Sequence, residues 1–382
     1  MKFAIFYEIP VPRPWGELSE YHAFKNTLTQ AIAAEQAGFD SFWTVEHHFL
    51  EEFSHCSNPE VLYGAVAAST ERLRIGYGVR LGPKPYNHPV RSAESAAVLD
   101  LISDGRVEFG TGRSSTRTEI EGFGLHPNDT REMWHEAVEH IVDCWVNEYS
   151  EFQGKHWSLP RRRVQPKPLQ KPHPPVWGAT GSPDGHRMMG ELGLGLLSFS
   201  VGTPPEQLKE RIDIYRQGIA ACTKPLGAFV NDRAACFTMV NCAPTKDESY
   251  DVSRESFAWY AKNAAELAAS VLVWLEEMKA KSDGTYAYLD EARQAVEQRL
   301  HELASLEALL AMNAVIAGDP DEVITRCKAY EATGADLLLC LVNPYKISHE
   351  QVMQTIDLMG KYVIPEFEDA RTSVTVTHAS GG

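Results

Sequence analysis

Residues 39–49, with the sequence FDSFWTVEHHF, decide the fold prediction for this chain. Aromatic and β-branched residues run up to Val45, and a carboxylate and two imidazoles follow at once, in Glu46, His47 and His48. Such a run predicts a buried strand, and the polar groups lie where that strand leaves the sheet. If the sheet is parallel and closed into a barrel, the carboxyl ends of its strands form the active-site face.

The two imidazoles have different predicted roles, because side chains alternate along an extended chain. His47 and His48 should therefore point to opposite sides, one into the pocket and the other toward packing or orienting contacts. This arrangement favours a single acid–base histidine over a shared metal site, and we expect no metal. The alternative for either residue is a structural histidine with satisfied hydrogen bonds.

Strand-like runs alternate with helical stretches along the rest of the chain. The predicted strands are 3–7, 41–45, 73–79, 106–111, 176–179, 195–200, 234–242 and 335–342. The predicted helices are about 21–37, 59–69, 90–102, 130–147, 183–192, 204–221, 320–333 and 349–361. Eight strands, each followed by a helix, predict an α/β fold with a parallel sheet closed into a (β/α)8 TIM barrel. The alternative is a doubly wound open sheet, which more often carries a glycine-rich turn after its first strand.

Two segments interrupt this alternation. Residues 151–159 predict a short hairpin, and the proline-rich residues 166–175 predict an extended connection. The segment from about 245 to 312 is amphipathic and helical in composition, and it follows strand seven, so it emerges on the active-site face. It is either a lid that keeps water from a reactive intermediate or a subunit interface. We predict one domain over 1–365 and a flexible C-terminal tail over 366–382.

Composition excludes several classes of partner. The net charge of −16 argues against nucleic acids and anionic membranes, whose recognition requires basic patches. No stretch approaches the roughly 18 uninterrupted apolar residues of a membrane span, and the amino terminus starts with a strand instead of a signal peptide. Seven scattered cysteines without a CxxC pair indicate free thiols in a reducing compartment. We therefore expect a cytoplasmic protein, and a homodimer or larger homo-oligomer.

Three further strand ends carry residues suited to a phosphate and a planar ring. Gly78 and Val79 end the third strand, and Arg113 follows two glycines at the end of the fourth. Glycine lets a ring or phosphate approach the backbone closely, and a guanidinium can bind a phosphate through two hydrogen bonds. The run Thr180-Gly181-Ser182 precedes a helix, whose first amides form an anion site. The alternatives are tight turns and a plain helix cap.

Together, the EHHF run at 46–49 and the GRVEFGTGR run at 105–113 resemble the bacterial luciferase-like family of flavin-dependent monooxygenases. The resemblance covers about 1–220 and resumes at 315–365. It implies that Thr180, Gly181 and Ser182 hold the flavin phosphate together with Arg113 and Arg131. The family carries a strained, often cis peptide beneath the flavin ring, and Gly78-Val79 matches that position. His47 is implied as a general base or hydrogen-bond partner near the ring, and His48 as a second imidazole that orients it.

The resemblance implies an enzyme that uses reduced FMN and molecular oxygen to oxygenate a small organic substrate. A separate NAD(P)H-dependent reductase would supply the reduced flavin, since no GxGxxG fingerprint opens a βα unit. Two positions depart from luciferase: Gly112 replaces its reactive cysteine, and Gly181 replaces an acidic residue. We therefore expect no light emission. The alternatives are a deazaflavin-dependent hydride-transfer enzyme of the same fold and a flavin-binding relative without catalysis.

Overall fold

The computed structural model describes residues 1–283 and 305–367, and its centre is a closed parallel barrel. Each strand pairs with the next in the order β1, β2, β3, β5, β8, β9, β10 and β12, and β12 pairs with β1. The predicted TIM barrel is therefore confirmed. The barrel strands are β1 (Lys2–Tyr7), β2 (Ser41–Thr44), β3 (Arg74–Tyr77), β5 (Val107–Gly112), β8 (Val176–Thr180), β9 (Gly195–Ser198), β10 (Ala234–Cys242) and β12 (Leu337–Leu341).

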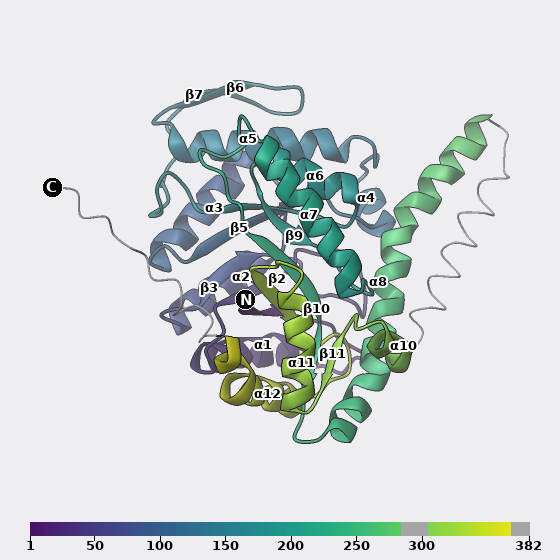
Figure 1. The fold of residues 1–382 in the computed structure, drawn as a ribbon. Helices are drawn as coiled ribbons and strands as arrows, with labels where there is room; N and C mark the ends of the chain where they lie inside the picture. The colour runs from purple at the N-terminus through teal and green to yellow at the C-terminus, as the bar shows by residue number, and fades with distance from the viewer. Residues whose placement is uncertain (284–304, 368–382) are drawn as a thin grey trace.

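An outer layer of helices covers this barrel, as Figure 1 shows. Most of these helices begin with a proline, which fixes the backbone angle that the first helical turn needs. The first helix ends before Gly38, whose positive φ of 91° reverses the chain toward β2. The outer helices are α1 (Ser19–Gln36), α2 (Pro59–Ser69), α3 (Pro89–Ile102), α5 (Thr130–Val146), α6 (Pro183–Glu191), α7 (Pro205–Ala221), α11 (Pro320–Glu331) and α12 (His349–Leu358).

Several short elements add to this framework. The predicted hairpin is present as an antiparallel pair, β6 (Ser150–Gln153) and β7 (Ser158–Arg162). Strand β4 (Arg80–Leu81) pairs with β5, and β11 (Ile316–Gly318) pairs with the end of β10. A one-turn helix, α4 (Arg117–Gly122), follows β5. Sequence periodicity missed the last three, because elements of two to six residues are too short to show a repeat.

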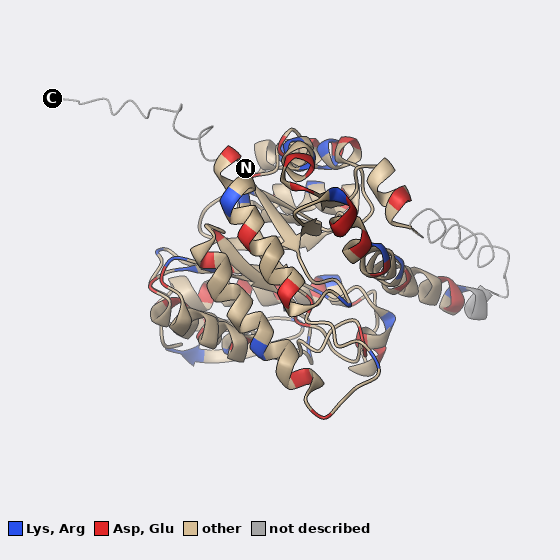
Figure 2. Ribbon diagram, turned by 90° about the horizontal axis from the view of Figure 1, so that it is seen from below, with Lys and Arg blue, Asp and Glu red and all other residues tan. Residues whose placement is uncertain are grey.

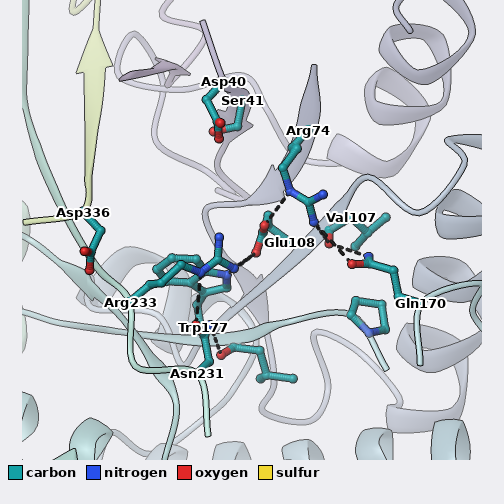
Figure 3. A network of polar contacts seen from close by, with 12 residues as sticks. Asp40, Ser41, Arg74, Val107, Glu108, Gln170, Trp177, Asn231, Arg233 and Asp336 are labelled. Carbon is teal, nitrogen blue, oxygen red and sulfur yellow. Dashed lines mark hydrogen bonds and ion pairs between the residues drawn. The ribbon is translucent and has the colours of Figure 1, made fainter. Parts of the chain in front are cut away.

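A polar network closes the amino-terminal end of the barrel (Figure 3). Glu108 of β5 is buried and accepts hydrogen bonds from Arg74 Nε at 2.6 Å, Arg233 at 2.7 Å and Trp177 Nε1 at 2.7 Å. Trp177 meets Trp43 of β2 edge to face inside the barrel, with ring centroids 5.7 Å apart. In barrels of this kind, the opposite, carboxyl-terminal end is the face that carries the functional site.

The insertion after the seventh barrel strand is helical where the structure describes it. It contains α8 (Lys246–Asp283) and α10 (Leu306–Ala311), and residues 284–304 lie outside the described residues. Figure 1 shows α8 along one side of the barrel, with its far end beyond the helix layer. Phe257 and Tyr260 of α8 are fully buried, so the first half of this helix belongs to the core.

The chain remains folded slightly beyond the predicted end of the domain. The π-helical turn η1 (Met359–Val363) and the 3-10 turn η2 (Ile364–Phe367) follow α12. Phe367 is buried and packs edge to face on Phe3, with ring centroids 5.0 Å apart. Glu366 and Phe367 thus belong to the turn η2, which the burial of Phe367 holds against the barrel. Residues 368–382 lie outside the described residues.

Charged residues of both signs are spread over the outer helices and α8 (Figure 2). Among the described residues, no helix is long and apolar enough to cross a membrane.

Candidate active site

Polar side chains converge on His47 at the carboxyl-terminal ends of the strands. Glu8 directly follows β1, and the EHHF loop follows β2. The backbone N–H of His47 donates to the carbonyl of Cys56 at 2.9 Å, which fixes the loop. About a fifth of the His47 side chain is exposed (21%).

The His47 imidazole lies between two buried carboxylates. Its Nδ1 is 3.0 Å from Oε1 of Glu119, a residue of α4, and its Nε2 is 3.6 Å from Oε2 of Glu8. Burial alone would lower the pKa of His47, but the charge and hydrogen bond of Glu119, together with the charge of Glu8, raise it to about 9. The imidazole is therefore protonated at neutral pH and can donate a hydrogen bond or a proton.

Glu119 is a firmly held partner of His47. Burial would raise its pKa, but the His47 charge and hydrogen bonds from several donors lower it to about 2. The hydroxyls of Ser114 and Thr116 donate to its Oε2 at 2.9 and 2.7 Å, and the backbone N–H of His48 donates to its Oε1 at 3.0 Å. Thr116 also caps α4 by accepting the Glu119 N–H. The short helix α4 thus fixes the Glu119 carboxylate as an anion.

The Glu8 carboxylate accepts fewer hydrogen bonds than that of Glu119. The hydroxyl of Tyr260, on α8, donates to Glu8 Oε1 at 2.7 Å. The other oxygen, Oε2, is buried and has no hydrogen-bond partner within the described residues. Burial raises the pKa of Glu8, although the His47 charge and the Tyr260 hydroxyl oppose this shift. Glu8 is therefore the carboxylate of the pair whose charge changes most easily.

His48 has a separate set of neighbours from His47. Its ring stacks on Tyr86 at 5.9 Å and meets Phe123 edge to face at 5.0 Å. Its Nε2 lies 3.5 Å from Oε1 of Glu46, and the Asn87 side-chain amide donates to that oxygen at 2.8 Å. The two imidazoles thus face different surroundings, as expected, and His48 has the more aromatic and enclosed position.

The Gly78-Val79 peptide bond is cis, as the resemblance implies. A side chain at Gly112 would place its Cβ 2.5 Å from Val79 Cγ2, closer than any real contact. Gly110 is equally constrained, since a Cβ there would lie 1.9 Å from the carbonyl oxygen of Tyr77. The small residues of β5 therefore make room for the backbone that follows β3. This packing gives a physical reason why a cysteine does not fit at Gly112.

Arg113 and Arg131 form a cationic pair beside the end of β8. Strand register aligns Thr111 with Gly178, so Arg113 is level with Thr180. Arg113 donates to the Thr130 hydroxyl at 2.9 Å, and burial and the charge of Arg131 lower its pKa. Within residues 1–283 and 305–367, neither arginine forms an ion pair. Arg113 does not pair with Glu119, whose carboxylate lies against His47.

The predicted anion turn is exposed at the start of α6. Ser182 caps this helix by accepting the Gly185 N–H at 3.1 Å, so the plain cap considered from the sequence is present. Gly181 and Ser182 remain exposed beside this cap. Beneath the turn, His186 bridges the Ser182 carbonyl at 2.7 Å and the Ser198 hydroxyl at 2.9 Å. The turn is therefore held in place while its outer side faces solvent.

Sequence reasoning missed three residues of the His47 network. Glu8 directly follows the first strand, so the strand-end rule that selected His47 could also have found it. Glu119 lies in α4, a helix that the sequence did not predict. Tyr260 lies inside the insertion interpreted as a lid or an interface, and nothing in the sequence links its hydroxyl to Glu8. Among the described residues, no cluster of three or more His, Cys, Asp or Glu side chains could hold a metal ion.

Comparisons with known proteins agree on one family. The model of the luciferase-like monooxygenase family matches residues 1–337. The oxygenase component of a flavin-dependent trigonelline monooxygenase from Acinetobacter baylyi is 24% identical over 97% of both chains. A 4-hydroxyprotoasukamycin monooxygenase from Streptomyces nodosus subsp. asukaensis is 27% identical over 90% of this chain and 87% of the relative.

Solved structures show the same fold. The oxygenating constituent of 3,6-diketocamphane monooxygenase from Pseudomonas putida, in complex with FMN, has a TM-score of 0.71 at 21% identity, over 96% of this chain and 98% of that one. An F420-dependent secondary alcohol dehydrogenase has a TM-score of 0.67 at 20% identity, over 95% and 98% of the two chains. The fold alone therefore does not separate flavin from deazaflavin enzymes.

Proposed function

The chain belongs to the luciferase-like monooxygenase family, and from this premise we propose that it uses reduced FMN and molecular oxygen to oxygenate a small organic substrate. The proposed reaction needs a cation or proton donor where negative charge develops on oxygen. It also needs a site for the flavin phosphate and a source of reduced flavin.

The observation that carries this proposal is the position of His47 between two buried carboxylates, Glu8 and Glu119, with about a fifth of its side chain exposed. The two carboxylates raise the pKa of His47 to about 9, so its imidazole is protonated at neutral pH. The resemblance implies two possible roles for His47, general base or hydrogen-bond partner. A protonated imidazole cannot accept a proton, so its charge favours the role of hydrogen-bond donor. A protein that only stored flavin would have no need of a charged acid at this position, so the arrangement supports catalysis.

The residues at the strand ends fit FMN. Arg113 and Arg131 carry two positive charges without an acidic partner among the described residues, which suits a phosphate with two negative charges. The exposed turn at Thr180, Gly181 and Ser182 opens α6 and adds the amides of a helix start. Bound reduced FMN would supply the electrons for oxygen activation. His47 would stabilise the developing oxyanion, while His48 would orient the loop.

A separate reductase is the proposed source of reduced FMN. The sequence has no GxGxxG fingerprint of a dinucleotide site, and the Acinetobacter relative is named as an oxygenase component. The named substrates of the relatives are chemically different, so we propose no particular substrate.

Anaerobic titration with FMN, reduced FMN and a reduced deazaflavin tests the proposal. We expect reduced FMN to bind and, on admission of oxygen without substrate, to be oxidised with release of hydrogen peroxide. His47→Asn protein should bind reduced FMN equally well, which separates binding from chemistry. Selective binding of the reduced deazaflavin, with no oxygen consumption, would favour hydride transfer. Binding of FMN without any change in its oxygen reactivity relative to free flavin would favour a storage protein.

A further inference from the structure

One side chain of the insertion reaches the active site. Tyr260 of α8 donates its hydroxyl to Glu8 Oε1 at 2.7 Å, and Oε2 of the same carboxylate lies 3.6 Å from His47 Nε2. Tyr260 is fully buried and Glu8 is 4% exposed. Phe53 stacks on the Tyr260 ring, with centroids 5.0 Å apart. The contact between α8 and His47 therefore passes through an enclosed carboxylate, shielded from bulk water.

In this enclosure, the Tyr260 hydrogen bond affects the charge on Glu8. Donation of an O–H to a carboxylate favours the ionised form, whereas burial favours the neutral form. Glu8 Oε2 has no hydrogen-bond partner within the described residues, so Tyr260 and the His47 charge are what oppose neutralisation. An ionised Glu8 in turn attracts the proton on His47, because low-dielectric surroundings strengthen the interaction between the two charges.

The other groups near His47 differ from Glu8 in their surroundings. Glu119 on α4 has a pKa of about 2 and remains ionised. Glu46, in the same loop as His47, accepts hydrogen bonds from the backbone of Leu81 and from Asn87 on its two oxygens. Burial raises the pKa of the Cys56 thiol to about 12, so it remains neutral. Glu8 is thus the neighbour whose charge can respond to a small change in position.

Helix α8 also contacts the elements on both sides of the site. Trp259 stacks on Tyr345, beyond β12, with centroids 3.8 Å apart. Farther along the helix, the Ser270 hydroxyl accepts the backbone N–H of Arg117 at 2.9 Å, and Glu277 pairs with the Arg117 guanidinium at 3.0 Å. Arg117 begins α4, the helix that carries Glu119. Helix α8 is therefore linked to both carboxylates that face His47, to Glu8 through Tyr260 and to Glu119 through α4.

We propose that Tyr260 and Glu8 form a positioning arm through which helix α8 sets the orientation and protonation of His47. When Tyr260 donates to Glu8, the ionised carboxylate holds His47 in its donor form. Without that hydrogen bond, the neutral form of Glu8 becomes more favourable, and His47 then loses its proton more readily. The effect on turnover rests on the proposed function, whereas the coupling between Tyr260 and His47 does not.

The test compares three variants of the full chain: Glu8→Gln, Tyr260→Phe and Tyr250→Phe. The last is a matched control, because Tyr250 also lies on α8 and donates to a carboxylate, Glu322 Oε1, at 2.9 Å, far along the helix from His47. The measurement is the pKa of His47, obtained by NMR titration of protein with labelled histidine. The His47→Gln variant assigns the signal.

Glu8→Gln should lower the His47 pKa by about 1 unit, at the low end for loss of an adjacent opposite charge. Tyr260→Phe should lower it by a smaller amount, and Tyr250→Phe should leave it unchanged. Both tyrosine variants lose one similar hydrogen bond, so a merely structural role would give equal changes. A wild-type His47 pKa in Tyr260→Phe, or an equal shift in Tyr250→Phe, would overturn the proposed arm.

The same variants separate this inference from the proposed function, since the titration needs neither flavin nor oxygen. If the His47 pKa shifts as expected but reduced FMN shows no enhanced reaction with oxygen, the arm stands and the proposed function fails. If the protein changes the reaction of reduced FMN with oxygen but the His47 pKa is the same in Glu8→Gln, Tyr260→Phe and wild type, the positioning arm is wrong and the proposed function is unaffected. If the positioning arm and the proposed function are both correct, the alkaline limit of turnover should move to lower pH in Glu8→Gln, because His47 then loses its proton at lower pH.

Discussion

Each end of the barrel buries a carboxylate among charged partners, but the two carboxylates differ in how fully they are bonded. At the amino-terminal end, Arg74 donates to one oxygen of Glu108, and Arg233 and Trp177 donate to the other (Figure 3). At the carboxyl-terminal end, one oxygen of Glu8 is bonded and the other faces His47 without a hydrogen bond.

The difference separates a structural network from a chemical one. Arginine keeps its charge at any physiological pH, so the partners of Glu108 have fixed charges and the network can only stabilise. Histidine titrates, and a carboxylate with an open oxygen beside it can exchange protons. This division follows the barrel, whose amino-terminal face contributes stability and whose carboxyl-terminal face carries chemistry.

The largest expected effect is on turnover at the carboxyl-terminal end. His47→Asn should lower the turnover number by about 10²–10⁴-fold, the usual contribution of a general acid, while FMN affinity stays close to wild type. The melting temperature should also stay close to wild type above pH 9, where His47 is neutral. His48→Ala is the control, with a milder loss of turnover and a larger loss of stability, because His48 packs among aromatic rings. The opposite ranking would show that the two imidazoles have been assigned the wrong roles.

At the amino-terminal end, the expected effect is on stability alone. Glu108→Gln should lower the free energy of unfolding by about 3 kcal/mol, the low end for breaking a buried ion pair, because both arginines are partly exposed. Denaturant titration measures this change. Asp213→Asn, which breaks an exposed pair with Lys209, should cost less than about 1 kcal/mol. A loss of turnover in Glu108→Gln at unchanged stability would show that the amino-terminal network affects catalysis, contrary to the structural role assigned to it.

The pH dependence of stability should report the His47 network. The folded-state pKa of His47 is raised from 6.5 to about 9, so its contribution is complete below pH 6.5 and is lost as pH rises through 9. The folded-state pKa of Glu119 is lowered from 4.5 to about 2, so the stability that its charge contributes is complete above pH 4.5 and is lost as pH falls through 2.

Unfolding free energies measured along this range should therefore show an alkaline loss on the order of 3 kcal/mol that depends on His47. The His47→Asn protein should be less stable than wild type at neutral pH and should lack that part of the alkaline loss. Parallel curves for the two proteins between pH 6.5 and 9 would mean that His47 gains no stabilising charge on folding.

A smaller effect is expected at the proposed phosphate site. Arg113→Ala should weaken FMN binding by about 1.5–3 kcal/mol and riboflavin binding much less, because the charge-assisted bond requires the phosphate. Calorimetric titration with both ligands measures the difference. Lys224→Ala, a change at a distant exposed lysine, should affect neither ligand. Equal weakening of FMN and riboflavin would place Arg113 away from the phosphate.

The sequence predicted the barrel because its strands and outer helices are long enough to show apolar periodicity. It also selected His47, Gly78-Val79 and Arg113, since each directly follows a strand at the end where barrel sites form. The short elements β4, β11 and α4 were missed because they contain too few residues to repeat a pattern.

The pairing of charges could not be predicted in the same way. Tyr260 and Glu8 are 252 residues apart, and only the folded chain brings them together. The contact of Glu119 with His47 depends on the orientation of α4, a helix too short to be predicted from the sequence. The role of the insertion as a lid or an interface, and assembly as a homo-oligomer, remain predictions.

The most direct test of this account is the titration of His47 in the wild-type protein by NMR of its ring nitrogens. The account predicts an imidazole that remains protonated through neutral pH and titrates at about 9, because two buried carboxylates face it. A pKa at or below the ordinary 6.5 would contradict it. His47 would then be neutral at neutral pH, and the carboxyl-terminal end of the barrel would hold no charged acid.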